Sequence, residues 1–483
     1  MLSSDLKALF AGFTDTSDWD ETKVSGLCLD SREIENNDLF LAVPGKSTDG
    51  RQFISAALVS GAAAVVAEFP AAYSGTGKVY EVQGLKRLIG AIADRFYQSP
   101  SKQLCVIGVT GTNGKTTCCH LLAQVLQKLG AQSGVLGTLG NGLVGELHQA
   151  ELTTSDAVHV HKDLRGLFDK GADFICMEAS SHALDQGRVD RVAFDITLFT
   201  NLSQDHLDYH GDMQSYGEAK ARLFQWPDLT AQVVNIDDPF GAWLAEQSGS
   251  GVLWTYGECA AARVQLQKLS VLPDRIELRV TADNTCTEIC VALLGSFNAM
   301  NVLAVFATLL ALGFPAARAA QALSTVQPVR GRMEVVLKPG KARVVVDYAH
   351  TPDALSKALQ ACRAQCSGKL WVIFGCGGDR DSSKRADMGS IACLNADYSI
   401  VTSDNPRCEN PLAIIADIQA GCDGSEVVLE NRQKAIAFAI SQASKNDIIL
   451  VAGKGHETYQ IVGKRYLPMD DRLLAEQAME GIS

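Results

Sequence analysis

The sequence has few positive charges and lacks any basic run of the kind that binds nucleic acids. Its 43 Lys and Arg residues are outnumbered by 55 Asp and Glu residues, which gives a formal net charge of -12 at pH 7. Proteins that bind a phosphate backbone gather lysine and arginine on one surface, so this composition argues against a nucleic-acid partner. Anionic ligands must then be bound by a few local residues.

Long apolar stretches are also absent. Apolar segments such as residues 56–67 fall short of the ~20 residues that a helix needs to cross a bilayer. The first 13 residues contain Asp5 and no long apolar core, so they do not resemble a signal peptide. From these absences we expect a soluble cytoplasmic protein.

The 14 cysteines lack the spacing of a metal site. Cys286/Cys290 and Cys362/Cys366 are pairs with three residues between them, and no second pair or histidines are arranged to complete a zinc site. We therefore expect reduced thiols that act as small hydrophobic side chains. Internal repeats and low-complexity tracts are absent as well.

A length of 483 residues and an apolar content of 47% predict about three domains with buried cores. Residues 1–100 are typical of a small α/β domain, with strands expected at 38–43 and 63–67 and a helix at 53–61. Ser99-Pro100-Ser101 is the expected linker to the next domain.

Residues 101–328 predict a parallel sheet, because strands expected at 105–109, 174–177 and 196–199 alternate with helical patterns. Near the end of this region, residues 275–280 alternate with period two. With a turn at Asp283-Asn284 and a second strand at 286–291, they predict an antiparallel hairpin.

Residues 329–483 repeat a strand-then-loop pattern, with strands expected at 344–346, 370–374, 399–402 and 448–451. Open α/β sheets bind their ligands at the carboxyl ends of such strands. The patterns together predict an α/β chain of three domains: a small N-terminal α/β domain, a central P-loop parallel sheet with an antiparallel hairpin, and a C-terminal Rossmann-like doubly wound domain.

The most informative segment is Val106-Ile107-Gly108-Val109-Thr110-Gly111-Thr112-Asn113-Gly114-Lys115-Thr116-Thr117. An apolar strand, a glycine-rich turn and a helix start form the arrangement that holds nucleotide phosphates. Backbone amides face the anion, Lys115 reaches the terminal phosphates, and the Thr116 hydroxyl can ligate Mg²⁺. Val109 stands where the general pattern has glycine, so this loop is a variant of that pattern.

Two further segments place ligand-type side chains after predicted strands. Glu178 follows strand 174–177, where a P-loop sheet has a carboxylate that holds Mg²⁺ directly or through water. The segment from Thr200 to His210 contains two histidines and two aspartates, which indicates a second metal or a reacting phosphate. A polar surface loop explains the same composition. Lys220 lies alone in a helical pattern, and its expected state is a solvated charge.

The loops of the third domain offer paired charges in place of a dinucleotide site. Residues 375–380 fail the G-x-G-x-x-G pattern because Arg380 stands at its last glycine, so a nicotinamide cofactor is poorly supported. Arg380, Arg407 and Glu457 lie on loops that follow different strands. Two guanidinium groups suit a carboxylate and a carboxylate suits an ammonium group, which is how a site holds an amino acid.

On these motifs the chain resembles the Mur ligases, ATP-dependent amide-forming enzymes of peptidoglycan precursor synthesis, over essentially its whole length. Folylpolyglutamate synthetases are similar but usually have glycine at the position of Thr116. The segment 200–220, together with Asp30-Ser31-Arg32 and Asp49-Gly50-Arg51, resembles the third ligase of the series. That enzyme adds the third residue of the stem peptide to UDP-N-acetylmuramoyl-L-alanyl-D-glutamate.

One loop bears on the amino acid that is added. Asp404-Asn405-Pro406-Arg407 resembles the form selective for meso-diaminopimelate, whereas forms that add lysine lack the arginine. Diaminopimelate carries a distal carboxylate that Arg407 can pair with, and lysine does not. Use of L-lysine by the same ligase is the alternative.

The resemblance implies a mechanism in which ATP phosphorylates the γ-carboxylate of D-glutamate and the amine of diaminopimelate then expels phosphate. It implies Mg²⁺ as the cofactor and ATP as a co-substrate. Catalytic roles fall on Lys115, Glu178, His206 and Lys220, the last carbamylated. One metal is assigned to Thr116 and Glu178, and a second to His206 and carbamylated Lys220.

The resemblance also assigns the binding residues. ATP contacts fall on Gly111, Thr112, Asn113, Gly114, Lys115, Thr116, Thr117, Asn298, Arg332 and Asp347. Contacts to the UDP-muramoyl dipeptide fall on Leu29, Ser31, Thr153, Thr154, Ser180, Gln186 and Arg188, and those to diaminopimelate on Arg380, Asp404, Asn405, Pro406, Arg407, Gly453 and Glu457. We expect a monomer. Leu152 and Lys46-Ser47-Thr48 depart from the family pattern. These departures affect individual substrate contacts and leave the expected reaction unchanged.

Two rival functions predict ATP binding too. One is another ligase on the same scaffold, of the folylpolyglutamate or cyanophycin type, which the 404–407 loop and the Asp30-Ser31-Arg32 motif disfavour. The other is a switch or transport ATPase that hydrolyses ATP without forming a bond. Such a protein needs no amino-acid site in its third domain.

Overall fold

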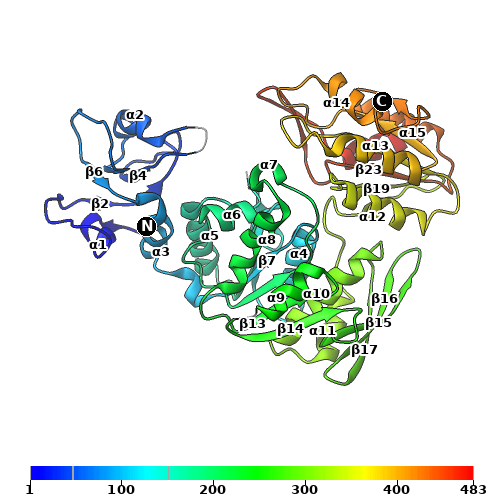
Figure 1. The fold of residues 1–483 in the computed structure, drawn as a ribbon, viewed down its shortest axis with the longest axis horizontal. Coiled ribbons are helices and arrows are strands. Elements are labelled where there is room, and N and C mark those ends of the chain that lie inside the picture. The colour runs from blue at the N-terminus through cyan, green and yellow to red at the C-terminus, as the bar shows by residue number, and fades with distance from the viewer. Residues whose placement is uncertain (1, 46–47, 151, 248, 482–483) are drawn as a thin grey trace. The chain divides into compact units, whose positions relative to one another are not determined.

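The computed structural model describes residues 2–45, 48–150, 152–247 and 249–481. Two compact units divide the chain, the first made of Met1–Gly108, Gly130–Thr197 and Gln225–Thr230, and the second of Val109–Leu129, Leu198–Phe224 and Ala231–Ser483. Figure 1 draws the elements of both units. Within the described ranges, no helix combines the length and the apolar character that crossing a bilayer requires.

The N-terminal part of the first unit is a four-stranded parallel sheet in the order β3-β4-β5-β6. Its elements are β1 (Ser4–Asp5), α1 (Leu6–Phe10), β2 (Lys23–Val24), β3 (Gly26–Cys28), β4 (Asp38–Ala42), α2 (Ile54–Val59), β5 (Ala64–Glu68), β6 (Val79–Val82) and α3 (Leu85–Phe96). Alternate residues of β4 enter two cores: Leu39 and Leu41 pack in the cluster that contains α3 residues, and Phe40 packs with Ile54 of α2. The predicted small α/β domain is confirmed.

The rest of the first unit surrounds two parallel strands, β8 (Ser133–Gly137) and β11 (Phe174–Glu178). Its other elements are η2 (Pro100–Gln103), β9 (Gly140–Leu143), β10 (Glu146–His148), α5 (Ala157–Asp169) and α6 (Ser181–Gln186). The segment predicted as a linker forms part of η2, a 3-10 turn in which Pro100 and Ser101 are buried. The predicted boundaries at residues 100 and 328 stay a prediction.

Two strands, β7 (Cys105–Thr110) and β12 (Ile196–Phe199), have residues in both units. In the second unit the chain continues from β7 through the glycine-rich loop into α4 (Lys115–Lys128). The following elements are α7 (Leu207–His210), α8 (Met213–Ala221), β13 (Ala231–Asn235), α9 (Pro239–Glu246), β14 (Val252–Gly257), α10 (Phe297–Ala311) and α11 (Ala316–Leu323). The apolar helix α10 is buried along most of its length and contacts α4.

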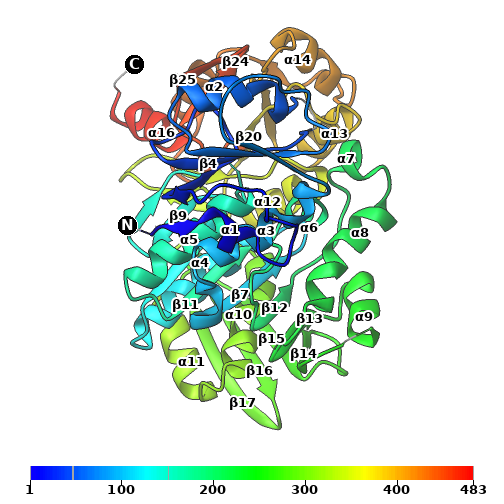
Figure 2. The same cartoon turned by 90° about the vertical axis from the view of Figure 1, so that its left-hand side faces the viewer.

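An antiparallel hairpin follows β14 and β15 (Val264–Val271), as predicted. It consists of β16 (Ile276–Ala282) and β17 (Thr285–Val291), with Ala282 paired to Thr285. The turn residues Asp283 and Asn284 both have positive φ, 45° and 64°, which a two-residue type I′ turn requires and which Asp and Asn tolerate. Figure 2 shows β15, β16 and β17 side by side.

A six-stranded sheet with the order β18-β19-β23-β20-β21-β22 organises the C-terminal part of the second unit. Its elements are β18 (Glu334–Val336), β19 (Arg343–Asp347), α12 (Pro352–Arg363), β20 (Leu370–Phe374), α13 (Lys384–Asn395), β21 (Tyr398–Val401), α14 (Pro411–Gln419), β22 (Val427–Val428), α15 (Arg432–Gln442), β23 (Ile448–Ala452), β24 (Tyr459–Val462), β25 (Arg465–Pro468) and α16 (Asp471–Glu480). The four strands predicted from the sequence are confirmed within one residue at each end.

The two faces of this sheet are covered by different helices, as a doubly wound domain requires. Leu370, Val372 and Phe374 share a core with α12, α13 and α14, whereas Trp371 and Ile373 share one with α15 and α16. The strands β19, β23, β20 and β21 are parallel neighbours, so the loops that follow them meet at one edge of the sheet.

Candidate active site

The glycine-rich loop has the backbone of a phosphate site. Gly114 precedes α4 with a φ of 89°, and a Cβ at this position would lie 2.5 Å from the Asn301 side-chain oxygen. Glycine is therefore required there by both conformation and space. The first amides of α4 have no helical acceptor, so they and the helix dipole favour an anion beside Lys115.

Lys115 folds back over this loop. Its ammonium group donates hydrogen bonds to the carbonyl oxygens of Gly111 at 2.8 Å and Thr112 at 2.9 Å. The Tyr216 hydroxyl lies 3.2 Å from the Thr112 hydroxyl, which ties α8 to the same loop. The Lys115 side chain is thus held within reach of any phosphate that the loop amides bind.

Lys220 of α8 is buried, although its local sequence predicts a solvated charge. Its ammonium group donates to the Gly111 carbonyl at 2.8 Å and lies 4.3 Å from the centre of the Tyr216 ring. Burial, together with the positive charge of Lys115, holds the pKa of Lys220 well below its ordinary value. The solvated-charge expectation is wrong because the aromatic ring and the loop enclose the side chain.

The loop from Thr200 to His210 brings its residues to the same place. The Thr200 hydroxyl donates to the Asn113 carbonyl at 2.6 Å, and the Ser203 backbone N–H donates to the Thr112 hydroxyl at 3.0 Å. The His206 side chain is 44% exposed, and its Nε2 lies 3.5 Å from Asp205. The segment is therefore more than a polar surface loop, because its first residues hold the phosphate loop in place.

Asp205 is negatively charged near neutral pH. Burial opposes ionisation of its carboxyl group, but the neighbouring His206, His350 and Lys384 outweigh burial and lower its pKa. His350 follows β19, and burial lowers the pKa of its imidazole, with Lys384 acting in the same direction. An anionic carboxylate next to a half-exposed imidazole is a reasonable pair for a cation or for a proton transfer.

Glu178 lies at the end of β11 in the first unit and is fully buried. Its carboxylate accepts hydrogen bonds from the Thr138 backbone N–H at 2.8 Å and the Thr138 hydroxyl at 3.1 Å. Because two donors stabilise the charged form, the group is set up as an oxygen ligand in a buried position.

A cavity of about 410 Å³ lies in the second unit beside the phosphate loop. Six of the residues predicted to contact ATP line it: Asn113, Gly114, Thr117, Asn298, Arg332 and Asp347. The remaining walls are formed by α10, α12 and the aromatic side chains of Tyr256, Phe297 and Tyr348. A cavity beside a phosphate loop that combines aromatic and polar walls has room and chemistry for a nucleotide.

Arg332 and Asp347 connect the C-terminal sheet to this cavity. Arg332 donates to the Thr116 hydroxyl at 3.1 Å, and its guanidinium lies 4.5 Å from the centre of the Tyr348 ring. Asp347 accepts from the backbone N–H groups of Met333 at 2.7 Å and Ala349 at 2.8 Å. Burial raises the pKa of the Asp347 carboxyl group.

A second cavity, of about 730 Å³, lies in the first unit. Leu29, Ser31, Gln186 and Arg188, all predicted to contact the UDP-muramoyl dipeptide, line it together with Lys86. Leu152, one of the two departures from the family pattern, also lines it and is 49% exposed. Of the other departure, Thr48 is a lining residue, while Lys46 and Ser47 lie outside the described residues.

The other predicted muramoyl contacts form a hydrogen-bonded chain that runs from this cavity to Glu178. Arg188 donates to the Thr154 carbonyl at 2.9 Å, and the Thr154 hydroxyl donates to the Glu178 carbonyl at 2.7 Å and lies 3.2 Å from the Ser180 hydroxyl. The Thr138 hydroxyl bridges Thr153 and Glu178 at 3.1 Å each. The predicted dipeptide contacts and the predicted metal ligand thus belong to one network.

The predicted amino-acid site lies at the carboxyl edge of the C-terminal sheet. The Asn405 side chain donates to Glu457 at 2.7 Å and accepts from the Ile461 backbone N–H at 3.0 Å. The Arg407 backbone N–H donates to the Ile461 carbonyl at 3.0 Å, and its guanidinium donates to the Gly378 carbonyl at 2.8 Å. Asn405 and Arg407 are therefore both fixed to the backbone of Ile461 in β24.

Gly453 and Asp404 complete this edge. Arg380 lies beside it, since a Cβ on Gly377 would lie 2.8 Å from the Arg407 guanidinium and 3.8 Å from the Arg380 side chain. A Cβ on Gly453 would lie 2.6 Å from the Asp404 carboxylate, so the two loops are in close contact. Pro406 is buried, while Arg380 is exposed on the loop after β20. The structure brings together Asp404, Asn405, Pro406, Arg407, Gly453 and Glu457, and leaves the Arg380 side chain in solvent.

Lys454 is a residue of this edge that the sequence interpretation missed. Its side chain is completely buried, and its ammonium group donates to Asn405 at 3.1 Å and to Glu457 at 2.9 Å. A buried lysine that holds two predicted substrate contacts is a positioning residue. Its place between Gly453 and Gly455 was the available signal, since loops that let a backbone approach closely often carry functional side chains.

Known proteins match the chain along most of its length. Three family models match, the Mur ligase family catalytic domain at residues 23–97, the Mur ligase middle domain at 109–309 and the Mur ligase glutamate ligase domain at 331–455. A UDP-N-acetylmuramoyl-L-alanyl-D-glutamate–2,6-diaminopimelate ligase of Ectopseudomonas mendocina (strain ymp) is 46% identical over 460 residues, 94% of each protein.

Solved structures agree with this match. A structure of a UDP-N-acetylmuramoyl-L-alanyl-D-glutamate–2,6-diaminopimelate ligase is 33% identical, covers 100% of this chain and 99% of its own, and superposes with a TM-score of 0.71. The MurF ligase of Thermotoga maritima, solved in complex with ADP, shares the fold at 18% identity and a TM-score of 0.67, with 95% and 97% of the two chains covered.

Proposed function

The chain belongs to the Mur ligase family, and on this basis we propose that it joins meso-diaminopimelate to UDP-N-acetylmuramoyl-L-alanyl-D-glutamate. The bond formed is an amide between the γ-carboxylate of D-glutamate and an amine of diaminopimelate, and ATP is converted to ADP and phosphate. The enzyme works in peptidoglycan precursor synthesis, and we expect it to act in the cytoplasm as a monomer.

The charged groups around Ile461 support diaminopimelate as the amino-acid substrate. Arg407 supplies a cation, and the neighbouring Asn405–Lys454–Glu457 cluster supplies hydrogen-bonding groups and a carboxylate. Diaminopimelate has two ammonium groups and two carboxylates, whereas lysine has no distal carboxylate. A guanidinium held in position favours the ligand with the additional carboxylate.

The two cavities supply separate sites for the larger substrates. The 410 Å³ cavity of the second unit takes ATP, with its phosphates at the loop 111–117. The 730 Å³ cavity of the first unit takes the UDP end of the muramoyl substrate, where Lys86, Arg32 and Arg188 can meet a diphosphate. The Thr154–Ser180 network leads from that cavity toward Glu178.

The residues on the phosphate loop carry out the phosphoryl transfer. Lys115 leaves its two backbone acceptors to reach the terminal phosphates, where its charge is balanced by the developing negative charge. The γ-carboxylate attacks the terminal phosphorus and releases ADP. The diaminopimelate amine then attacks the acyl phosphate and expels phosphate, after losing a proton.

Each predicted magnesium ligand offers an oxygen atom of the kind that Mg²⁺ prefers. Thr116 has a hydroxyl, and Glu178 has a buried carboxylate oriented by Thr138. A bound Mg²⁺ would supply positive charge against the phosphate oxygens. Thr116, in the second unit, and Glu178, in the first, stay the predicted ligands of this ion.

Lys220 is suited to carbamylation. Only the neutral form of an amine adds CO₂, and the depressed pKa of Lys220 increases that form near neutral pH. The neutral amine nitrogen bonds to the carbon of CO₂ and loses one proton, which gives an anionic carbamate. Counted from the ammonium form, two protons leave and a cation becomes an anion. The carbamate and His206 would then hold a second Mg²⁺.

The decisive experiment measures phosphate release and amide product together. Purified protein receives ATP, Mg²⁺ and the UDP-muramoyl dipeptide, with meso-diaminopimelate or L-lysine in parallel. We expect phosphate release and product in equal amounts, and only with diaminopimelate. Release of phosphate independent of any amino acid would favour an ATPase, and equal use of lysine would remove the role of Arg407.

A further inference from the structure

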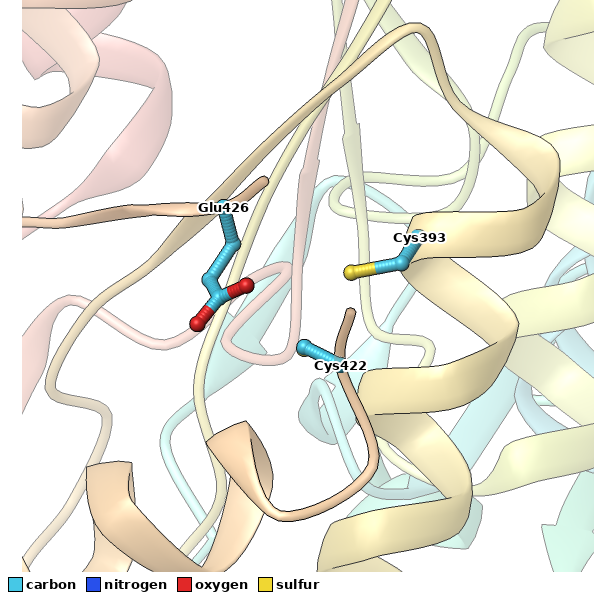
Figure 3. A group of neighbouring side chains, drawn as sticks. All are labelled: Cys393, Cys422 and Glu426. Carbon is cyan, nitrogen blue, oxygen red and sulfur yellow. The ribbon is translucent and has the colours of Figure 1, made fainter. Parts of the chain in front are cut away.

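A group of metal-ligand side chains lies in the C-terminal part of the second unit, away from the edge that carries the amino-acid site. Cys393 is near the end of α13, Cys422 follows α14, and Glu426 precedes β22. One ligand atom from each lies within 4.8 Å of the others, and Figure 3 shows the three residues grouped together, with the Cys393 sulfur and the Glu426 carboxylate on facing sides of the group. Among the residues that the structure describes, no other group of His, Cys, Asp or Glu meets this criterion.

Close backbone packing builds this group. A Cβ on Gly389 of α13 would lie 2.1 Å from the Ile418 carbonyl and 3.2 Å from the Cys422 sulfur, and a Cβ on Gly421 would lie 1.8 Å from the Ala386 carbonyl. Only glycine at both positions lets α13 and the end of α14 approach so closely. The separation of the two sulfurs is therefore set by the fold.

Glu426 contributes an oxygen that lacks a partner. Its Oε1 accepts a hydrogen bond from the Gln419 side chain at 2.8 Å, whereas its Oε2 is buried without any hydrogen-bond donor. An ionised carboxylate oxygen that is removed from water costs free energy unless a cation or a proton meets it. The Glu426 carboxylate thus lacks a donor or cation on the oxygen that is buried beside the two thiols.

We propose that Cys393, Cys422 and Glu426 form a binding site for a zinc-type divalent cation. Two thiolates and one carboxylate are ligands that Zn²⁺ accepts, and a water molecule can take the fourth position because all three residues are only partly buried. Each bound ion displaces two thiol protons, because the cysteines bind as thiolates.

The site would join the two helices whose first turns lie beside the amino-acid loops. Arg385, at the start of α13, pairs with Glu409, which precedes α14, at 2.9 Å and with Asp417, near the end of α14, at 2.8 Å, so the helices are already linked. A metal at Cys393 and Cys422 would add a second link, from the far end of α13 to the segment that follows α14. The cation has a structural role and takes no part in the ligase reaction.

Cobalt provides the direct test, because thiolate ligands give Co²⁺ a charge-transfer absorption that oxygen ligands do not. Full-length protein is reduced, freed of metals, placed in Mg²⁺ buffer and titrated with Co²⁺ alone. We expect a thiolate band that saturates at one Co²⁺ per chain, is removed by Zn²⁺, and appears with release of two protons per ion. Excess Mg²⁺ should not compete, since it is a hard ion.

Single substitutions locate the site. Cys393→Ser and Cys422→Ser should remove the band, and Glu426→Gln should weaken Co²⁺ binding about tenfold or more. Cys259→Ser, an exposed cysteine elsewhere in the second unit, is the matched control and should leave the band unchanged. Binding raises the melting temperature of the wild type only, which separates the site from a folding defect in the variants.

Three results would overturn the proposal. The first is no thiolate band when thiol titration shows both cysteines reduced. The second is a band that survives both serine variants. The third is a Cys393–Cys422 disulfide in peptide maps of the protein before reduction, which would identify the pair as a redox couple.

Discussion

Lys115 and Lys220 donate hydrogen bonds to the same carbonyl oxygen, that of Gly111, each at 2.8 Å. Two ammonium groups so close together repel each other, and the buried one yields its charge more easily. Lys115 belongs to the phosphate loop and keeps its cationic role in binding phosphate. Lys220 is the group whose pKa this pairing lowers.

Replacement of Lys220 by alanine should reduce kcat about 100-fold or more, because the variant cannot form the carbamate. Depletion of CO₂ should lower the activity of the wild type and leave the residual activity of Lys220→Ala unchanged. Steady-state kinetics with and without bicarbonate measure both effects. Lys434→Ala, at an exposed lysine, is the control and should respond to CO₂ as the wild type does. Equal CO₂ sensitivity of Lys220→Ala and Lys434→Ala would contradict the carbamate.

The stability of the wild type relative to Lys220→Met should increase as the pH rises from about 7 to about 10. Folding holds the Lys220 pKa well below 10.5, so the unfolded chain binds a proton that the folded chain does not. Unfolding therefore takes up a proton, and a higher pH removes that driving force. Urea unfolding of both proteins in CO₂-free buffer measures the difference, and a flat difference would contradict the depressed pKa.

Lys454→Met should raise the KM for diaminopimelate about tenfold or more and leave the KM for ATP near its wild-type value. The substitution removes the donor that holds Asn405 and Glu457 together. The split between the two KM values separates positioning of the amino-acid site from a general loss of structure. Lys445→Met, at an exposed lysine, should change neither value, and parallel changes in both KM values for Lys454→Met would indicate a purely structural role.

Arg407→Ala should reduce kcat/KM for meso-diaminopimelate about 10- to 100-fold, since a charged hydrogen-bond partner of the distal carboxylate is lost. The KM for ATP should change little, because Arg407 does not line the nucleotide cavity. Competition between diaminopimelate and L-lysine measures the selectivity directly. Arg465→Ala removes an exposed guanidinium from β25 and serves as the matched control.

Arg432→Met should lower the free energy of unfolding by about 3–5 kcal/mol, because Asp471 is then left as a buried charge without its partner. In the wild type Arg432 pairs with Asp471 at 2.7 Å and donates to the Ala452 carbonyl at 2.8 Å, and both side chains are fully buried. Urea unfolding provides the measurement. Arg432→Met combined with Asp471→Leu should recover most of the loss.

The exposed pair Arg279–Glu288 provides the comparison for that experiment. Arg279→Ala should cost less than about 1 kcal/mol, since water screens the interaction. Equal losses at the buried and exposed pairs would contradict the argument from burial.

The fold was largely predictable from local patterns. The pair Asp283-Asn284 predicts the hairpin because few residues tolerate two successive positive φ values. The four predicted strands of the C-terminal sheet are apolar runs between loops, and their bounds shift by one residue at most, whereas the short strands β18 and β22 were not predicted. Such features depend on neighbours along the chain, which a sequence displays.

Whether an individual side chain is buried or exposed was harder to predict from the sequence. Lys220 and Arg380 are both single basic residues in polar segments, yet one is buried over an aromatic ring and the other is exposed. Residues far away in sequence decide this difference, as Gly111 does for Lys220. Lys454 was missed for the same reason, since its acceptor Asn405 comes 49 residues earlier.

The walls of the nucleotide cavity come from several separate stretches of the second unit, among them those around residues 113–117, 200–201, 296–301 and 332–360. A molecule seated there touches all of them at once and acts as a noncovalent crosslink within the second unit. Its binding energy therefore opposes separation of these stretches, and an occupied cavity makes the unit stiffer than an empty one. The cell's ATP supply thereby becomes a determinant of how rigid this enzyme is.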